Sequence, residues 1–260
     1  MDRAVSKKFK FCLTGVGFLI MVFWGEVRSA PAEIAIQPEV VQIGTWYDGA
    51  KLHVRAHIPE GCQAVLELSG ERDQTRLMRK EEHWGLWKNG EEIIERGAPE
   101  IYLAMSTDPE LLAGSKDAVP WGYAAIDRNV SFTGAIHKIE DRRLFHEFLR
   151  LKESRGRYGI FPGSASITGL PGKDPLVEGV FSLPVHLTQG NYQVALSVVK
   201  DGMVLSKEER PLKVELVGFP AAIFNLAHKH PSTYGIMAAG IAILCGFLVG
   251  LIFQFIGKSE

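Results

Sequence analysis

The residues best suited to metal chemistry are two histidines, His53 and His57, which lie four positions apart. On a helix this spacing would place both imidazoles on one face, where they could share a metal ion. The segment 51–58, however, alternates apolar and polar residues throughout, which is typical of a half-buried β-strand. Four residues of strand separate two Cα atoms by about 13 Å, too far for one ion. We therefore expect exposed strand histidines and no metal site.

A second group of candidates consists of Cys62 and of His228 and His230, which flank a lysine before the last apolar segment. Cys62 follows a turn-like Pro-Glu-Gly and is predicted to be a small packed side chain, with a reactive thiol as the alternative. The two histidines suit anchoring at lipid headgroups, and a proton or metal site there is the alternative. The sequence has no Gly-x-Ser-x-Gly, His-Glu-x-x-His, Cys-x-x-Cys or phosphate-binding glycine loop. We expect no enzymatic activity and no cofactor.

Charge and aromatic content add little chemistry. The 260 residues include 29 Lys and Arg against 30 Asp and Glu, which argues against a nucleic-acid partner because such binding needs a basic excess. The basic stretch 138–157 is interpreted as a solvated helix face, with contact to anionic headgroups or to a partner as the alternative. Four aromatic residues are expected to pack in the core or at its rim rather than to form a ligand cage: Trp84, Trp87, Trp121 and Tyr102.

Two apolar segments direct the chain to a membrane. Residues 1–32 have a basic start, an uncharged run and small residues at Ala30 and Ala32, the order of a signal peptide, with an uncleaved anchor as the alternative. Residues 234–256 are long enough to span a bilayer, and Gln254 is their only strongly polar member. The predicted protein spans the bacterial inner membrane once. Its bulk lies in the periplasm, and residues 257–260 form a cytoplasmic tail.

The hydrophobic pattern of the segment between them predicts mainly β-strands. Alternating or apolar runs occur at 40–43, 51–58, 64–68, 76–80, 100–105, 164–170, 177–183, 192–198 and 212–216, and Asp201-Gly202 suits a type I′ hairpin turn. We predict a mainly β domain over 33–218, an immunoglobulin-like antiparallel sandwich. A helical insertion at about 108–156 interrupts it, because apolar residues recur at helical spacing in 141–154. One interrupted sandwich is favoured over two small ones, and residues 219–233 form a juxtamembrane linker before one C-terminal transmembrane helix.

The membrane segment carries a pattern that suits helix packing. Small residues recur at every fourth position and a glutamine continues the ridge, namely Ala238, Ala242, Gly246, Gly250 and Gln254. Such spacing lets another helix approach closely, and the amide can hydrogen-bond across the contact. We predict a packing face for an integral membrane partner or for self-association. A plain anchor in the lipid bilayer is the alternative.

Several short stretches resemble a family of transmembrane proteins described mainly from alphaproteobacteria. They are Gly85-Leu86-Trp87-Lys88-Asn89, Pro99-Glu100-Ile101-Tyr102-Leu103-Ala104, Tyr158-Gly159, Gly190-Asn191-Tyr192 and the juncture from Phe224 to Gly235. The resemblance spans nearly the whole mature chain except 117–134, and its motifs are structural. It implies an envelope protein associated with sulfite-exporter-type permeases and supplies no catalytic residues.

The expected function is that of a non-enzymatic, membrane-anchored periplasmic accessory protein for a membrane partner, a permease for a small anion. Two alternatives stay open. One is a periplasmic enzyme or metal-handling protein that uses Cys62 or the histidines. The other is an envelope scaffold or adhesion protein, whose partner would lie outside the membrane.

Overall fold

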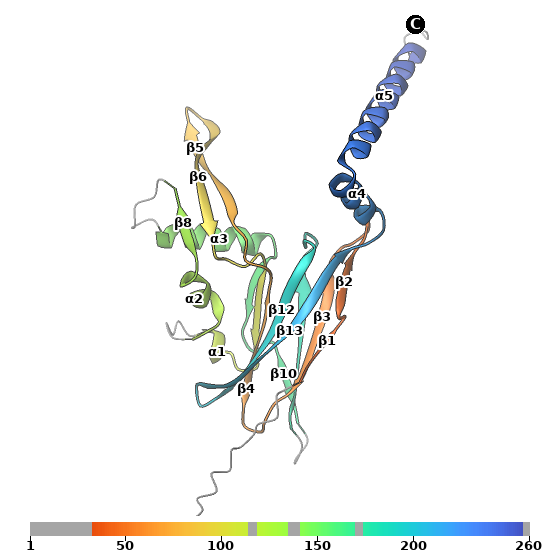
Figure 1. The fold of residues 1–260 in the computed structure, drawn as a ribbon. Coiled ribbons are helices and arrows are strands. Elements are labelled where there is room, and N and C mark those ends of the chain that lie inside the picture. The colour runs from red at the N-terminus through yellow and green to blue at the C-terminus, as the bar shows by residue number, and fades with distance from the viewer. Residues whose placement is uncertain (1–32, 114–118, 135–140, 170–173, 257–260) are drawn as a thin grey trace, which may run out of the picture. The chain divides into compact units, whose positions relative to one another are not determined.

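The computed structural model describes residues 33–113, 119–134, 141–169 and 174–256 (Figure 1). The predicted signal peptide at 1–32 and the predicted tail at 257–260 lie outside these residues. The domain from 33 to 218 is mainly β, as predicted, and we call it the β-rich domain.

Two sheets pack face to face as a sandwich. The first has four strands in the order β1-β3-β11-β10, all paired antiparallel. These strands are β1 (Ile34–Gln37), β3 (Ala50–His57), β11 (Leu176–Leu183) and β10 (Ser166–Thr168). In β3 the alternation expected from the sequence is present, because every second residue is buried and those between are exposed.

The second sheet has six strands in the order β2-β13-β12-β4-β7-β9. They are β2 (Val40–Ile43), β13 (Met203–Leu216), β12 (Gly190–Lys200), β4 (Gln63–Ser69), β7 (Tyr102–Ser106) and β9 (Tyr158–Phe161). The sheets are mainly antiparallel, as predicted, and the two edge strands of this sheet pair parallel to their neighbours. Parallel pairing needs a long crossover, and the segment between β7 and β9 supplies one.

The sandwich core lies between these sheets. Leu52 and Phe181 of the four-stranded sheet are buried against Leu66 and Leu196 of the six-stranded sheet in one cluster. Cys62 belongs to the same cluster and is buried, which agrees with a packed side chain. The predicted Asp201-Gly202 turn is present between β12 and β13, with both residues at positive φ.

A third sheet was not predicted. It consists of β5 (Thr75–His83), β6 (Leu86–Arg96) and β8 (Ser131–Thr133), in that order. β5 and β6 form a long hairpin whose turn is Trp84-Gly85 (Figure 1). Trp84 and Trp87, expected in or around the core, are exposed here, while Trp121 and Tyr102 are buried as expected.

Three helices follow β7 within the predicted insertion: α1 (Glu110–Ala113), α2 (Gly122–Asp127) and α3 (Asp141–Ser154). They cover the outer face of the six-stranded sheet, the face that points away from the four-stranded sheet. Phe148 of α3 and Ile126 of α2 share a buried cluster with Tyr102 and Tyr158 of that sheet. Trp121 is buried beside Val65 in a neighbouring cluster. The six-stranded sheet is therefore packed on both faces at β12, β4 and β7, whereas β2 and most of β13 have one exposed face.

Two helices end the described chain. The segment expected to be a linker forms α4 (Gly218–Lys229), and α5 (Pro231–Ile256) begins three residues earlier than the predicted membrane span. A helix of 26 residues is about 39 Å long and can cross a bilayer with some tilt. Of the helices described, α5 alone is long and apolar enough to span a membrane. Val217 ties the start of α4 to β2 by donating its backbone N–H to Ile43 over 2.9 Å.

We expect a fragment of residues 33–218 to be soluble and to show a mainly β circular dichroism spectrum, because it keeps the sandwich and lacks both apolar segments. Urea unfolding of this fragment should be a single cooperative transition, since the insertion is packed on the sheet. A mainly helical spectrum, or two separate transitions for the sandwich and the insertion, would contradict this expectation.

Candidate functional site

Glu67 is a buried carboxyl group in the middle of the six-stranded sheet. It lies on β4, which is buried on both faces, and its side chain is 8% exposed on the outer face. Its direct cross-strand neighbours are two alanines, Ala195 on β12 and Ala104 on β7. Because these side chains are small, they leave space above the sheet between Glu67 and the insertion.

The hydroxyl of Tyr102 joins Glu67 to helix α2. It donates a hydrogen bond to Oε1 of Glu67 over 2.5 Å and accepts one from the backbone N–H of Gly122 over 2.7 Å. Gly122 is the first residue of α2 and has a φ of +77°, and Trp121 before it provides no side-chain cap. The phenol therefore satisfies a helix N–H group that would otherwise be buried without a partner.

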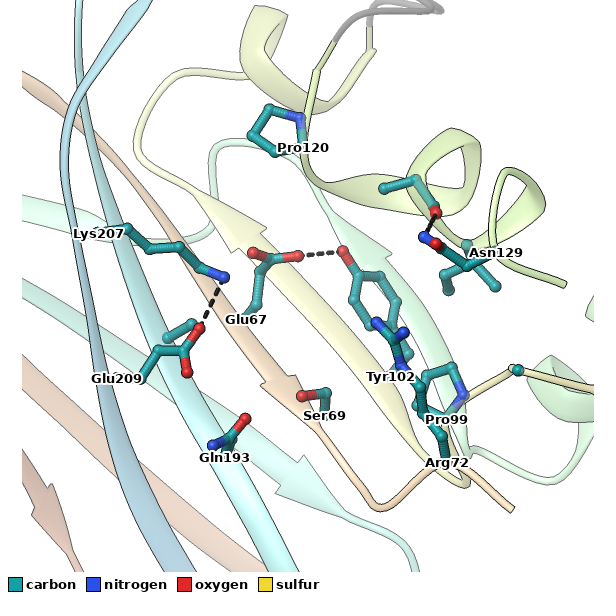
Figure 2. Close-up of a pocket in the computed structure, with 14 residues that line it drawn as sticks. Glu67, Ser69, Arg72, Pro99, Tyr102, Pro120, Asn129, Gln193, Lys207 and Glu209 are labelled. Carbon is teal, nitrogen blue, oxygen red and sulfur yellow. Dashed lines mark hydrogen bonds and ion pairs between the residues drawn. The ribbon is translucent and has the colours of Figure 1, made fainter. Parts of the chain in front are cut away.

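Glu67 and Tyr102 line a partly open, polar pocket with a volume of about 180 Å³ (Figure 2). The sheet supplies Glu67, Ser69, Gln193 and Lys207, and the insertion supplies Asn129. Lys207 makes an ion pair with Glu209 over 2.7 Å at the wall of the pocket. A pocket of this size suits one small polar molecule or a few water molecules.

Burial shifts the pKa of both groups in the pair. It raises the pKa of the Glu67 carboxyl, and the hydrogen bond from Tyr102 and the charge of Lys207 oppose that rise only in part. Burial and the nearby Glu67 also hold the pKa of the Tyr102 phenol well above its ordinary value. The Tyr102 phenol stays neutral and its hydrogen is donated to Glu67, so Glu67 is the group of the pair that is able to exchange a proton. The lining residues include no histidine or cysteine.

A second buried polar pair lies where β6 meets α3. The Glu95 side chain is fully buried; its Oε1 accepts a hydrogen bond from the N–H of Ala98 over 2.8 Å, and its Oε2 has no hydrogen-bond partner. Lys152 is buried too, with its Nζ 5.2 Å from the ring centroid of Phe148 and 5.5 Å from that of Tyr158. Burial raises the pKa of Glu95 and lowers that of Lys152, although each group's charge favours the charged form of the other.

This pair corrects the interpretation of the basic stretch as a solvated face. Arg150 and Arg155 are exposed, but Lys152 is buried, and Arg157 makes an ion pair with Glu100 over 3.5 Å. Helical spacing explains the difference, because Lys152 lies four residues after Phe148 and shares its buried side of α3.

The residues predicted from the sequence lie apart from both pairs. His53 and His57 are exposed on the four-stranded sheet, and Cys62 is in the sandwich core. His228 stacks on Phe224 of α4 with ring centroids 4.0 Å apart. Within the described part of the chain, no group of three or more His, Cys, Asp and Glu residues could hold a metal ion.

The predicted packing residues of the membrane helix all lie on α5, and each of them is exposed. A Cβ atom placed on Gly246 or Gly250 would meet nothing within 4 Å. The rest of the chain therefore does not require a glycine at either position.

Sequence reasoning missed Glu67, Glu95 and Lys152 as buried polar residues. One signal for Glu67 was available, since it is a single carboxylate inside the apolar run Ala64–Leu68. A charged residue in a strand that is buried on both faces needs a partner within the protein.

Replacing Tyr102 by Phe should reduce the free energy of unfolding of the β-rich domain by about 1–3 kcal/mol, because it leaves the Glu67 carboxyl and the Gly122 N–H buried without their shared partner. Urea unfolding measures this loss. Tyr123→Phe is the matched control, since its hydroxyl donates to Glu153 at an exposed position and should contribute less. Equal losses in the two variants would contradict a structural role for the Tyr102 hydroxyl.

The stability of the β-rich domain should depend on the proton of Glu67. Because the folded pKa is raised, the folded state binds more protons than the unfolded chain between the ordinary carboxyl value and the raised one. The free energy of unfolding should therefore fall as the pH rises through that window, and Glu67→Gln should make the fall smaller. Urea unfolding at a series of pH values tests this. Glu147→Gln, which changes an exposed carboxylate on α3, should leave the slope unchanged.

Comparison with known proteins places the chain in a family. Residues 32–255 match the family described as "Putative transmembrane protein (Alph_Pro_TM)". No curated protein matches the chain. Among solved structures, it is similar to murine CRIg, with 9% identity and a TM-score of 0.24 over 72% of this chain and 99% of that one. A chain from the structure of T cell activation by the bacterial superantigen toxic shock syndrome toxin-1 has 5% identity, with the same TM-score and coverage.

TM-scores this low carry no argument about fold or function. The family match covers both the β-rich domain and the membrane helix, and the chain thus belongs to the Alph_Pro_TM family of transmembrane proteins.

Proposed function

We propose that this protein is a non-enzymatic, membrane-anchored accessory protein that binds an integral membrane partner through α5. The observation that carries the proposal is the free space around Gly246 and Gly250. Glycine is an unfavourable residue in a helix interior, and nothing in the described chain packs against these two. Their small size supports a contact with another helix, where close backbone approach is an advantage.

The contact is expected to centre on the C-terminal half of the ridge. Each step of four residues turns by about 40° around the helix, so Gly246, Gly250 and Gln254 lie within about 80° of each other. Ala238 and Ala242 continue the ridge as it winds around α5. Such a ridge suits a right-handed crossing, with the Gln254 amide available for a hydrogen bond between helices.

A permease for a small anion, of the sulfite-exporter type, is the partner implied by the family resemblance in the sequence. The periplasmic position of the β-rich domain rests on the signal-like order of residues 1–32. A second copy of α5 is the other partner with suitable chemistry. An envelope scaffold would need a binding surface on the β-rich domain instead.

The Glu67 pocket favours a second role for the β-rich domain, the binding of a small polar solute. It offers a carboxyl, a phenol and an ion pair in about 180 Å³. The alternative of an enzyme or metal protein loses support, because Cys62 is in the core and the strand histidines are exposed and separate from the pocket. Solute binding would give an accessory protein a signal to pass to its partner.

Replacing both Gly246 and Gly250 by Leu should leave the protein in the membrane, because Leu inserts more readily than Gly, and should weaken its association. The expected loss is on the order of 1 kcal/mol or more, since bulk at these positions prevents close approach and the Gln254 contact together. The measurement is co-purification from mild detergent, with the amount of bound membrane protein compared between variant and wild type.

Two control variants test whether the effect belongs to the ridge. Gly240→Leu adds the same bulk at a position about 120° around the helix from Gly246, where a Cβ also meets nothing in this chain. The double change Leu244→Ala and Leu251→Ala alters another face. Both controls should retain their partners. If the glycine variant retains them as well as wild type does, α5 is only an anchor.

A further inference from the structure

The tip of the β5–β6 hairpin presents a group of large apolar side chains to solvent. Trp84 is 97% exposed, Leu86 74% and Trp87 69%. The base of the same hairpin is held in the fold, because Ile93 is buried and Leu77 packs on the cluster beneath α3. The exposed tip therefore extends from a hairpin whose base is packed into the fold. We call residues 84–87 the hairpin tip (Figure 1).

The turn at the tip places Trp84 in a backbone conformation that is unfavourable for tryptophan. His83 pairs with Leu86, so Trp84 and Gly85 form a two-residue turn with φ values of +54° and +75°, the type I′ conformation. Left-handed backbone is unfavourable for a bulky side chain, whereas Asn, Asp and Gly tolerate it.

A second two-residue hairpin turn, between β12 and β13, has residues that suit this conformation. Asp201 and Gly202 occupy the same positions between β12 and β13, with φ values of +51° and +78°. The two turns thus share one geometry, and they differ in that one presents a carboxylate and the other an indole. A strained residue that packs on nothing in its own fold indicates a role outside that fold.

We propose that the hairpin tip inserts into the headgroup region of the membrane in which α5 is anchored. Trp combines a large apolar ring with one polar N–H and is enriched at membrane–water interfaces. Leu86 adds apolar area beside the two indoles. The membrane helix keeps the β-rich domain close to a bilayer, so that even weak insertion by three side chains becomes effective.

The size of the tip favours a lipid surface over a protein partner. A stable protein interface buries about 800 Å² on each side over 20 or more residues. The tip is a turn and the two residues that follow it, which is too small to form such an interface alone. Insertion between lipid headgroups needs no complementary surface.

The charges around the tip indicate which lipids it needs. Between residues 80 and 89, two lysines stand against two glutamates, so the segment has no excess of either sign. Lys80 contacts Asn89 across the hairpin, and Glu82 lies opposite Trp87 in the strand register. Insertion should therefore occur in zwitterionic phosphatidylcholine and should change little when anionic lipid is added.

The test uses the full chain in phosphatidylcholine vesicles whose acyl chains carry bromine, which quenches nearby indole fluorescence. Trp24→Phe and Trp46→Phe are introduced first, which leaves the two tip indoles and the buried Trp121, whose Nε1 donates to the carbonyl of Leu111. We expect bromolipid to quench most of the tip emission. Adding Trp84→Asn and Trp87→Thr should abolish that quenching. If the parent protein is quenched no more than this variant, the tip does not reach lipid and the proposal is overturned.

A second measurement separates insertion from folding. Asn suits the first position of a type I′ turn, so Trp84→Asn alone should leave the melting temperature unchanged or raise it while it reduces bromolipid quenching. A lower melting temperature would show that Trp84 stabilises the fold and would overturn the proposal. Blue-shifted tip emission that depends on protein concentration but not on bromolipid would show that the tip binds a second copy, which also overturns it.

Discussion

The architecture of this protein depends on a sheet whose central strands are covered on both faces. The four-stranded sheet packs on one face of β4, β7 and β12, and the helical insertion packs on the other. Both faces are covered, so a polar side chain there must find most of its hydrogen bonds within the protein. The Tyr102 hydroxyl meets this requirement for Glu67 and for Gly122 at once. The start of α2 is held by the Tyr102 contact, and the raised pKa of Glu67 follows from its burial.

This double coverage also explains how far the sequence predicted the fold. Strand β3 was predicted within one residue at each end, because its exposed and buried residues alternate. β4 has a run of five buried residues, so the sequence predicted a strand but did not indicate which side chains face the insertion. β6 was missed because it is mostly polar and follows Trp84-Gly85, a pair outside the usual set for a type I′ turn. The pocket combines residues from 67 to 209, and its composition depends on a strand register that alternation alone does not fix.

Glycine residues of the β-rich domain and of α5 differ in what surrounds them. A Cβ on Gly179 in β11 would clash with Sδ of Met105 and lie 2.7 Å from Cδ1 of Leu66, both in the facing sheet, so a larger residue would force these side chains to move. The packing between the two sheets thus favours a glycine at position 179. A Cβ on Gly246 or Gly250 would meet no neighbouring element within 4 Å among the residues that the structure describes, and α5 is exposed. Their sequence spacing could suggest packing, but only the structure separates glycines that the fold uses from glycines that it leaves free.

The insertion is attached to the sheet by polar contacts as well as by apolar ones. Because some of the polar groups are ionisable, the strength of this attachment depends on pH. Tyr102 and Glu67 connect the sheet to the start of α2, and Lys152 of α3 donates from Nζ to the carbonyl of Glu100 over 3.4 Å, close to the buried Glu95. Burial shifts the pKa of all three ionisable side chains, Glu67, Glu95 and Lys152, toward their neutral forms. A ligand or ion that enters the Glu67 pocket would change the charge balance at one of these contacts. Residues of α2 and α3 pack in the same cluster as Tyr102 and Tyr158, so packed side chains connect the two contacts. The insertion is therefore the part of the β-rich domain best placed to respond to a bound solute.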